Sequence, residues 1–203
     1  MAKLTRGFTK RESRVRAPWL PPGQYDIEDA WPVLTAEATP DLSTATWTFT
    51  VDGLVDRLTT WSWEQIHALP QSEYFGDIHC VTTWSKHNMS FAGVSVDTLL
   101  AAAGVKPKAT HVLATCYTGY TTNLPLADVT GGKAWIAFEV DGEPLPVAHG
   151  GPARLLVPHL YFWKSAKWVA GLTLLDHDEP GFWEQYGYHN HGDPWREERY
   201  SGD

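Results

Sequence analysis

Cysteine is scarce in this chain: only Cys80 and Cys116 occur among its 203 residues. Two cysteines are too few for a disulfide scaffold, and their number fits a reducing compartment. They also cannot build an iron–sulfur cluster with four cysteine ligands, and the sequence holds no CxxCH motif for haem attachment. If the chain carries out redox chemistry, its electrons must come from elsewhere.

Long apolar runs are absent as well. No stretch approaches the roughly 20 apolar residues that span a bilayer, and no apolar segment follows the basic N-terminus, as a secretory signal would require. The pair Lys10-Arg11 leads into Glu12, so a twin-arginine export signal is not indicated. We therefore expect a protein that is not membrane-embedded and lies in the cytoplasm, or in the periplasm if a leader has been removed.

The charge balance argues against nucleic-acid binding. The formal net charge is −8, whereas binding to phosphate backbones needs clustered Lys and Arg. Basic residues gather near the N-terminus, where residues 3–16 hold six of them against one acid. We interpret residues 1–24 as a basic, partly irregular arm that is solvated and attached to an acidic body.

Most regular segments of the chain have the composition of strands. Alternation or β-branched runs predict strands at 45–51, 110–116, 134–140, 153–157 and 168–175. Short helices are indicated only over 63–69, where Ser62 and Gln65 have capping-box spacing, and over 95–104. No internal repeat occurs, so we predict a single α+β domain over residues 25–203, with strands outnumbering helices.

The C-terminal segment, residues 176–203, is aromatic and rich in turn residues. We expect it to pack as an irregular strap with short helical turns, one of which begins at Asp193 and Pro194. His189, His191 and Asp193 recur at two-residue spacing and could bind zinc, but zinc sites usually need three or four ligands in a defined geometry. Surface or pocket lining is the more common explanation, and the sequence assigns these histidines no role.

The neighbourhood of Cys80 is unusual for a cysteine of the core. Residues 78–88 read IHCVTTWSKHN and are largely polar, with one Lys and two His. A thiol that only fills a core is expected among apolar residues, whereas polar neighbours and a cation favour the thiolate, which binds metals. We interpret Cys80 as a functional residue; a buried structural cysteine is the alternative.

A second signal is a stretch without acids. Residues 144–175 contain no Asp or Glu, although the whole chain is acidic. The run HGGPAR at 149–154 combines flexible backbone with an arginine, and the small Ser165 and Ala166 would let backbone amides approach a phosphate. The stretch therefore predicts an anion site, to which its basic residues would contribute: His149, Arg154, His159, Lys164 and Lys167.

Three motifs together carry a family resemblance. They are HCVTTWS at 79–85, FAG followed by VSVDTLL at 91–100, and LPVAHGGPARLLVP at 145–158 followed by LYFWKSAKWVAGL. In this order they resemble the sulfite-oxidase-like oxidoreductases that bind a single molybdopterin, over roughly residues 25–180, in the standalone bacterial form. The resemblance implies a mixed-sheet molybdopterin-binding fold and one molybdenum–molybdopterin cofactor per chain.

The same resemblance implies the site residues. Cys80 matches the one protein ligand to the molybdenum, and Lys86, Trp84 and His87 are expected to line the substrate side because they follow it closely. Further cofactor contacts are expected at Trp31, Pro32, His79, Thr115, Cys116, His149, Arg154, Ser165, Ala166 and Lys167. Thr115 and Cys116 are alternatives for one family position.

Two departures from the family bear on substrate and assembly. Sulfite oxidases have arginines four and five residues after the metal-binding cysteine, where this chain has Trp84 and Ser85. Sulfite is therefore a doubtful substrate, because a dianion favours the planar fork of arginine. The chain also ends before the family's dimerisation domain, so we expect a monomer.

The expected activity is oxygen-atom transfer on a small substrate, with electrons exchanged through a separate cytochrome or flavoprotein. Two other classes remain open. One is a zinc-dependent hydrolase that uses His79, Cys80 and the tail histidines. The other is a cofactor-free ligand-binding module, in which some of the 11 Trp residues stack on ligands.

Overall fold

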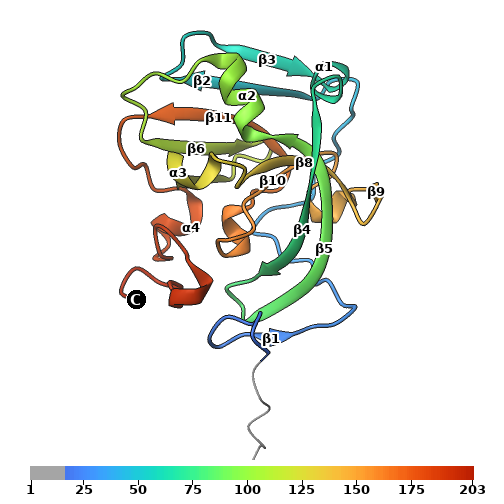
Figure 1. Ribbon diagram of the computed structural model, residues 1–203, viewed down its shortest axis with the longest axis vertical. Coiled ribbons are helices and arrows are strands. Elements are labelled where there is room, and N and C mark those ends of the chain that lie inside the picture. Colours follow the sequence, from blue (N-terminus) through green and yellow to red (C-terminus); the bar gives the residue numbers. More distant parts are fainter. Residues whose placement is uncertain (1–16) are drawn as a thin grey trace, which may run out of the picture.

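Residues 17–203 are described by the computed structural model, and their strands form two sheets (Figure 1). The first sheet contains β1 (Tyr25–Asp26), β4 (Gln71–His79), β5 (Trp84–Ser95), β8 (Trp135–Val140), β9 (Glu143–Pro144) and β10 (Arg154–Leu156). The second contains β2 (Thr48–Gly53), β3 (Thr59–Ser62), β6 (His111–Cys116), β7 (Thr121–Pro125) and β11 (Val169–Leu175).

The helices are few and short. They are α1 (Trp63–His67), α2 (Val96–Ala103), α3 (Leu126–Val129) and α4 (Phe182–Gln185). Three 3-10 turns accompany them: η1 (Val147–His149), η2 (Phe162–Lys164) and η3 (Pro194–Arg196). Strands therefore outnumber helices, as predicted for an α+β protein.

The second sheet supplies much of the core. Its order is β3-β2-β11-β6-β7, and β2 runs parallel to β11 while the other neighbours are antiparallel. Phe49 and Val51 of β2 are fully buried, whereas Thr48 is exposed and Thr50 half-buried. Burial on one face only is what the alternation in the sequence predicts.

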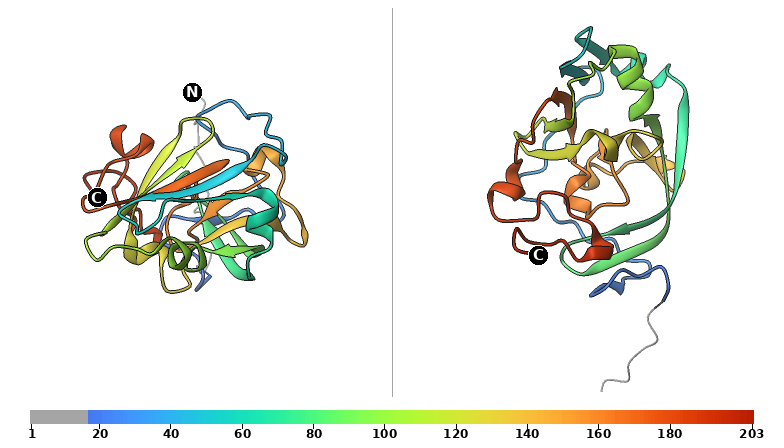
Figure 2. Two further views of the ribbon diagram at one scale, coloured as in Figure 1. Left: turned by 90° about the horizontal axis from the view of Figure 1, so that it is seen from above. Right: turned by 60° about the vertical axis from the view of Figure 1, so that its left-hand side comes forward.

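A long hairpin of β4 and β5 dominates the first sheet. It pairs from Gln71 opposite Val94 to His79 opposite Ser85, and β5 also pairs with β8. In Figure 1 the hairpin runs down one side of the molecule, and the right-hand view of Figure 2 shows its lower end near the red C-terminal strap. The turn at that end carries Cys80.

The predicted strands are largely confirmed. Those at 110–116, 134–140, 153–157 and 168–175 agree with β6, β8, β10 and β11 to within one residue at each end. The strand expected at 45–51 runs instead over 48–53, because Thr46 and Trp47 donate their amides to the Ser43 carbonyl in a turn. The sequence pattern does not reveal β4 and β5, whose alternation is interrupted by a register shift between Gly76 and Ile78.

Both predicted helices are confirmed by their caps. At α1, Ser62 Oγ accepts a hydrogen bond from the Gln65 amide and Gln65 Oε1 accepts one from the Ser62 amide. At α2, Ser95 Oγ accepts from the Asp97 amide, and the helix ends at Gly104, whose φ is 75°. Among residues 17–203 no helix is long and apolar enough to cross a membrane.

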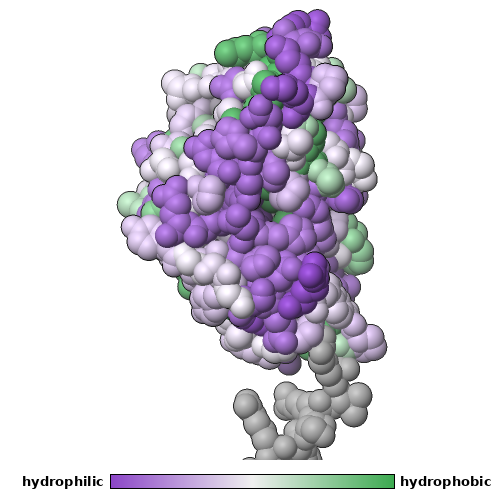
Figure 3. Space-filling model, turned by 90° about the vertical axis from the view of Figure 1, so that its left-hand side faces the viewer, coloured by the Kyte–Doolittle hydropathy of each residue, from purple (hydrophilic) through white to green (hydrophobic). Residues whose placement is uncertain are grey.

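Regular structure is sparse toward the C-terminal end of the described residues. Most of the arm expected over residues 1–24 lies outside the described residues. The C-terminal strap is irregular apart from α4 and η3, and Asp193 caps η3 by accepting a hydrogen bond from the Trp195 amide, as predicted. The face of the molecule that includes α4 and the strap is largely hydrophilic (Figure 3).

Candidate functional site

A cavity of about 330 Å³ lies where six segments of the chain meet. These are the irregular segment after β1, the β4–β5 turn, the β6–β7 turn, the loop from η1 to β10, the segment around η2, and the C-terminal strap. Its size falls in the range of small-molecule and cofactor sites. It is lined by Trp31, Pro32, Leu34, Thr35, Ala36, Glu37, Cys80, Val81, Thr82, Trp84, Tyr120, His149, Arg154, Phe162, Trp163, Ser165, Ala166, Lys167, Trp168, Trp183 and Tyr188.

Cys80 begins the tight turn between β4 and β5. Its amide donates to the Trp84 carbonyl at 2.8 Å, and its own carbonyl accepts from the Thr83 amide at 3.0 Å. The Sγ atom lies 3.2 Å from Thr82 Oγ1. Burial raises the pKa of the Cys80 thiol, while Thr82, Arg199 and Lys167 act in the opposite direction. The thiol is therefore protonated at neutral pH, and a metal ion held by Cys80 would favour its deprotonated form.

Two cations face the same cavity without a carboxylate partner among residues 17–203. Arg154 is buried, and its guanidinium donates to the carbonyls of His149 (2.8 Å) and Ser165 (2.6 Å). Lys167 Nζ donates to the carbonyls of Leu34 and Ala148, each at 2.8 Å. Burial lowers the pKa of Arg154 to about 9 and that of Lys167 to about 8. A buried cation is normally paired with an anion, so the buried Arg154, with the half-buried Lys167 beside it, indicates an anionic ligand.

The loop before β10 approaches these cations closely because it contains glycine. Gly150 has φ +110°, and a Cβ there would lie 3.1 Å from both Arg154 Cβ and Lys167 Cα. A side chain at this position would force the loop away from Lys167 and strain the backbone. Gly150, the first glycine of HGGPAR, thus allows Arg154 and Lys167 to share one end of the cavity.

Trp31 and His149 form a wall of the cavity. Their rings are stacked, with centroids 3.6 Å and planes 7° apart. Burial, with Arg154 and Lys167 nearby, lowers the pKa of His149 to about 4. The imidazole is therefore neutral at physiological pH, and it offers hydrogen bonds without adding a third positive charge.

The structure separates the three residues expected on the substrate side. Trp84 lines the cavity, and its buried Nε1 has no hydrogen-bond partner among the described residues. Lys86 and His87 do not line it. Lys86 Nζ donates to the Glu28 carbonyl at 2.8 Å, and His87 Nδ1 lies 3.3 Å from Asp26 Oδ1. The polar groups of Lys86 and His87 thus contact the segment that begins with β1 and do not face the cavity.

Three further expected contacts also lie outside the cavity lining. His79 Nδ1 is 2.8 Å from Ser85 Oγ, and burial lowers the pKa of His79 to about 4. Thr115 Oγ1 donates to the Gly171 carbonyl at 3.4 Å. Cys116 is buried in the core, which raises the pKa of its thiol strongly. The cofactor contacts expected of these residues stay predictions.

The remaining expected contacts are brought together. Trp31, Pro32, Cys80, His149, Arg154, Ser165, Ala166 and Lys167 all line the cavity. Lys164, expected to contribute to the anion site, does not, because its ammonium is paired with Glu184 in the interior.

Sequence reasoning misses several walls of the cavity. Residues 34–37 belong to an irregular segment without periodicity, and Tyr188 comes from the C-terminal strap. The aromatic composition of the strap was the one signal that could have pointed to Tyr188. Neither segment has a motif that would place it beside Cys80.

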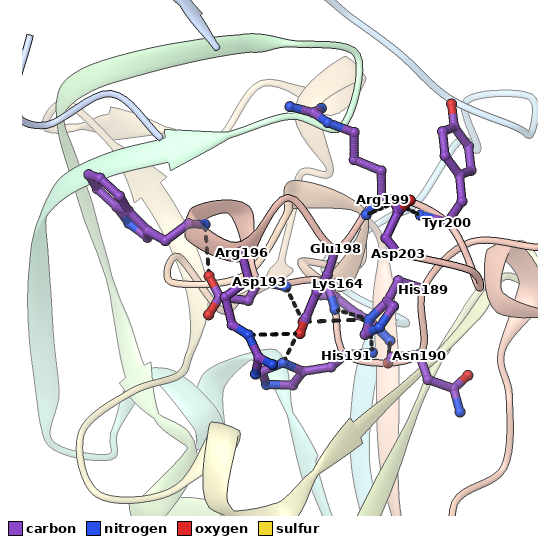
Figure 4. Close-up of polar contacts among 12 residues, drawn as sticks. Lys164, His189, Asn190, His191, Asp193, Arg196, Glu198, Arg199, Tyr200 and Asp203 are labelled. Carbon is purple, nitrogen blue, oxygen red and sulfur yellow. Dashed lines mark hydrogen bonds and ion pairs between the residues drawn. The ribbon is translucent and has the colours of Figure 1, made fainter. Parts of the chain in front are cut away.

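The tail histidines contact carboxylates. His191 Nδ1 lies 2.9 Å from Glu198 Oε2, and His191 Nε2 lies 3.0 Å from Asp128 Oδ2. His189 also approaches Glu198, and Figure 4 shows this group within the strap. Within residues 17–203, no group of three or more potential ligands has the arrangement of a metal site.

Comparisons with known proteins agree with this geometry. The family model of the oxidoreductase molybdopterin-binding domain matches residues 36–183. The oxidoreductase YuiH of Bacillus subtilis is 41% identical over 197 residues, which cover 97% of this chain and 99% of YuiH. The protein-methionine-sulfoxide reductase catalytic subunit MsrP of Gluconobacter oxydans is 29% identical over 171 residues, which cover 73% of this chain and 54% of MsrP.

A solved structure supports the fold. The sulfane dehydrogenase SoxCD of Paracoccus pantotrophus is similar with a TM-score of 0.64 and 26% identity, over 69% of this chain and 41% of the SoxCD chain. This chain thus spans about half of MsrP and less than half of the SoxCD chain. The matches confirm the family resemblance and the fold class that the sequence predicts.

Proposed function

Because the chain belongs to the family of oxidoreductase molybdopterin-binding domains, we propose that it is a molybdenum-cofactor-dependent enzyme that transfers an oxygen atom to or from a small substrate. One observation carries the proposal: a single cavity contains a cysteine thiol, the buried Arg154 and the half-buried Lys167, and neither cation has a carboxylate partner among the described residues. A cofactor with a metal at one end and a phosphate at the other requires this combination.

The residues fit such a cofactor. Cys80 would bind the metal, while Arg154, Lys167 and the backbone near Ser165 and Ala166 would bind the phosphate. The uncharged imidazole of His149 would form a hydrogen bond with the cofactor. When bound, one cofactor per chain supplies the oxygen-atom transfer chemistry, and the protein supplies its binding, orientation and electrostatics.

The surroundings of Cys80 argue against sulfite as the substrate. Trp84 and Ser85 stand where sulfite oxidases have arginines, and Ser85 Oγ already contacts His79. The nearby Lys86 is turned toward the Glu28 carbonyl. Trp84 lines the cavity and brings no positive charge, which suits a neutral substrate better than a dianion. A sulfoxide has this character, and the relative MsrP is a sulfoxide reductase.

Metal and pterin analysis tests the proposal. Protein from a cofactor-competent host should contain about one molybdenum per chain and give the fluorescence of oxidised pterin. Cys80→Ser should retain the fold, measured by thermal unfolding, and lose turnover. Stoichiometric zinc without molybdenum would favour a hydrolase, and protein that binds neither metal nor pterin would favour a ligand-binding module; either result contradicts the proposal.

Substrate preference is tested separately by steady-state kinetics with sulfite and with a neutral sulfoxide, each with a suitable artificial electron carrier. We expect kcat/KM for the sulfoxide to exceed that for sulfite by at least about tenfold, corresponding to ~1.4 kcal/mol of differential stabilisation. Sulfite turnover of equal efficiency would contradict the assignment of a neutral substrate.

Electron exchange requires a second protein. The chain has no haem-attachment motif and too few cysteines for an all-cysteine cluster, and the relative MsrP is a catalytic subunit. We therefore propose a separate cytochrome or flavoprotein as partner, and a monomer as the enzyme's own state. Full turnover without any added electron carrier would contradict the proposal of a separate redox partner. A stable dimer, detected by light scattering after size-exclusion chromatography, would contradict the proposal of a monomer.

A further inference from the structure

The turn that carries Cys80 has little support of its own. Thr83 has φ +78°, which is unfavourable for a β-branched residue and persists only where the surroundings impose it. Two main-chain hydrogen bonds close the turn, and Thr82 at its tip is exposed. In addition, side chains from distant segments donate hydrogen bonds to the carbonyls of Cys80 and Val81.

The two ends of the described chain provide these side chains. Gln24 Nε2 donates to the Cys80 carbonyl at 3.0 Å. From the C-terminal strap, Arg199 Nη1 donates to the Val81 carbonyl at 2.6 Å. Arg199 Nη2 donates to the Pro22 carbonyl at 3.3 Å, and the guanidinium carbon lies 4.9 Å from the centre of the Tyr161 ring. One planar guanidinium thus joins three segments at the turn.

The strap holds Arg199 in position. The Arg199 amide donates to Asp203 Oδ2 at 2.8 Å, and the Arg199 carbonyl accepts from the His189 amide at 3.1 Å. The neighbouring Glu198 is bound by His191, which also contacts Asp128 of α3. In Figure 4 the Arg199 side chain extends away from this cluster toward the green hairpin ribbon. No carboxylate within residues 17–203 forms an ion pair with its guanidinium.

From these contacts we infer that Arg199 is a positioning residue for Cys80. The C-terminal strap therefore helps to fix the position of the thiol in the cavity. Arg199 does not line the cavity and so acts through the turn. It fixes the Val81 carbonyl one residue after the thiol, and with Gln24 on the Cys80 carbonyl it prevents the strained turn from opening. The functional meaning of this role rests on the proposed function, in which Cys80 binds the metal.

Two variants and one control separate positioning from charge. Arg199→Met removes both the charge and the contacts, and Arg199→Lys keeps the charge but cannot reach both carbonyls in a planar fork. Arg196→Met is the matched control, because Arg196 lies on the same strap, is largely exposed and, among residues 17–203, forms an ion pair with Glu198 alone. Thermal unfolding of each variant establishes that it is folded.

The first measurement is hydrogen exchange in cofactor-free protein. The amides of Cys80 and Thr83 close the turn, so their exchange reports its opening. We expect exchange to accelerate at least about tenfold in Arg199→Met and Arg199→Lys, and to remain as in the wild type in Arg196→Met. Unchanged exchange in Arg199→Met would overturn the inference, as would full recovery of the wild-type rate by Arg199→Lys.

The second measurement is the electron paramagnetic resonance spectrum of pentavalent molybdenum in loaded enzyme. A displaced Cys80 sulfur should change the g-values in both Arg199 variants and not in the control. A general loss of stability would instead lower the amplitude of the signal and leave the g-values unchanged. A wild-type spectrum in both variants would overturn the inference. If Arg199→Met does not fold, Gln24→Leu takes its place, because it removes the other side chain bound to the turn.

These measurements distinguish the inference from the proposed function. Exchange in cofactor-free protein does not depend on molybdenum. If the wild type binds no molybdenum but the Arg199 variants open the turn, the proposed function fails and the positioning role stands. If molybdenum is bound and the turn is unaffected, the positioning role fails alone.

Discussion

Lys164 and Glu184 form an ion pair of 2.7 Å in which neither side chain is exposed to solvent. The same Glu184 oxygen accepts a hydrogen bond from Trp163 Nε1, and Lys164 Nζ also donates to both oxygens of Asn123. The acid-free stretch 144–175 therefore obtains its counter-ion from α4, outside the stretch. Lys164 supports the wall behind the cavity and is not available to an anion.

We expect Lys164→Met to destabilise the protein by about 3–5 kcal/mol, because it leaves a buried carboxylate unpaired. Urea unfolding at neutral pH measures this loss. Lys108→Met is the control, since Lys108 is largely exposed and its contact with Asp176 is long, at 3.6 Å. The control should change the free energy of unfolding by less than about 1 kcal/mol. Similar losses of unfolding free energy in Lys164→Met and Lys108→Met would contradict a buried ion pair between Lys164 and Glu184.

The stacking of Trp31 on His149 predicts that replacing Trp31 changes the pKa of His149. Trp31→Ala exposes the imidazole, so the pKa of His149 should rise from about 4 toward its ordinary value. Trp31→Phe keeps an aromatic ring and should change the pKa less. Nuclear magnetic resonance titration of cofactor-free protein measures the shift, and an unchanged pKa in Trp31→Ala would show that Arg154 and Lys167 alone depress it.

The two cysteines should differ in reactivity. Burial raises the pKa of both thiols. Thr82, Arg199 and Lys167 act against this effect at Cys80, whereas at Cys116 Glu37 adds to it and Arg154 alone opposes it. In cofactor-free protein at pH 8, iodoacetamide should therefore modify Cys80 at least about tenfold faster than Cys116. Peptide mass spectrometry gives both rates in one sample. Bound cofactor should protect Cys80, and modification of Cys116 first would contradict the expected order.

Stability should depend on pH through His191 and Asp128. A hydrogen bond to Asp128 raises the pKa of His191 against the effect of burial. Burial alone would raise the pKa of Asp128, but hydrogen bonds from His159 and His191 hold it below its usual range. The His191 contribution is thus complete below its unfolded pKa of about 6.5 and is lost as pH rises through its folded pKa. The Asp128 contribution is complete above about pH 4 and is lost as pH falls through its folded pKa.

The measurement compares urea midpoints of the wild type and His191→Gln between pH 4 and 9. The wild type should exceed the variant most at about pH 4–6.5, and the difference should shrink at higher pH. His177→Gln is a suitable control, because His177 is exposed and contacts only neighbours in the run 176–179. A difference that grows with pH would mean that His191 is neutral in the folded protein.

Much of the fold follows from local patterns. Alternation and capping signals predicted β6, β8, β10, β11 and both longer helices, because these signals arise within a few consecutive residues. The hairpin of β4 and β5 escaped prediction, since a register shift interrupts its alternation. Polar residues in that hairpin are explained only by the segments packed on them, such as residues 24–28.

By itself, the sequence determined the family, the fold class and the candidate metal ligand, because motif order and local composition carry that information. Only the tertiary structure decided which polar groups reach the cavity. It turned Lys86 and His87 toward β1, paired Lys164 with Glu184, and placed Arg199 on the turn beside Cys80. Arg199 and Val81 lie 118 positions apart. Such contacts depend on how the segments pack, and no local pattern encodes them.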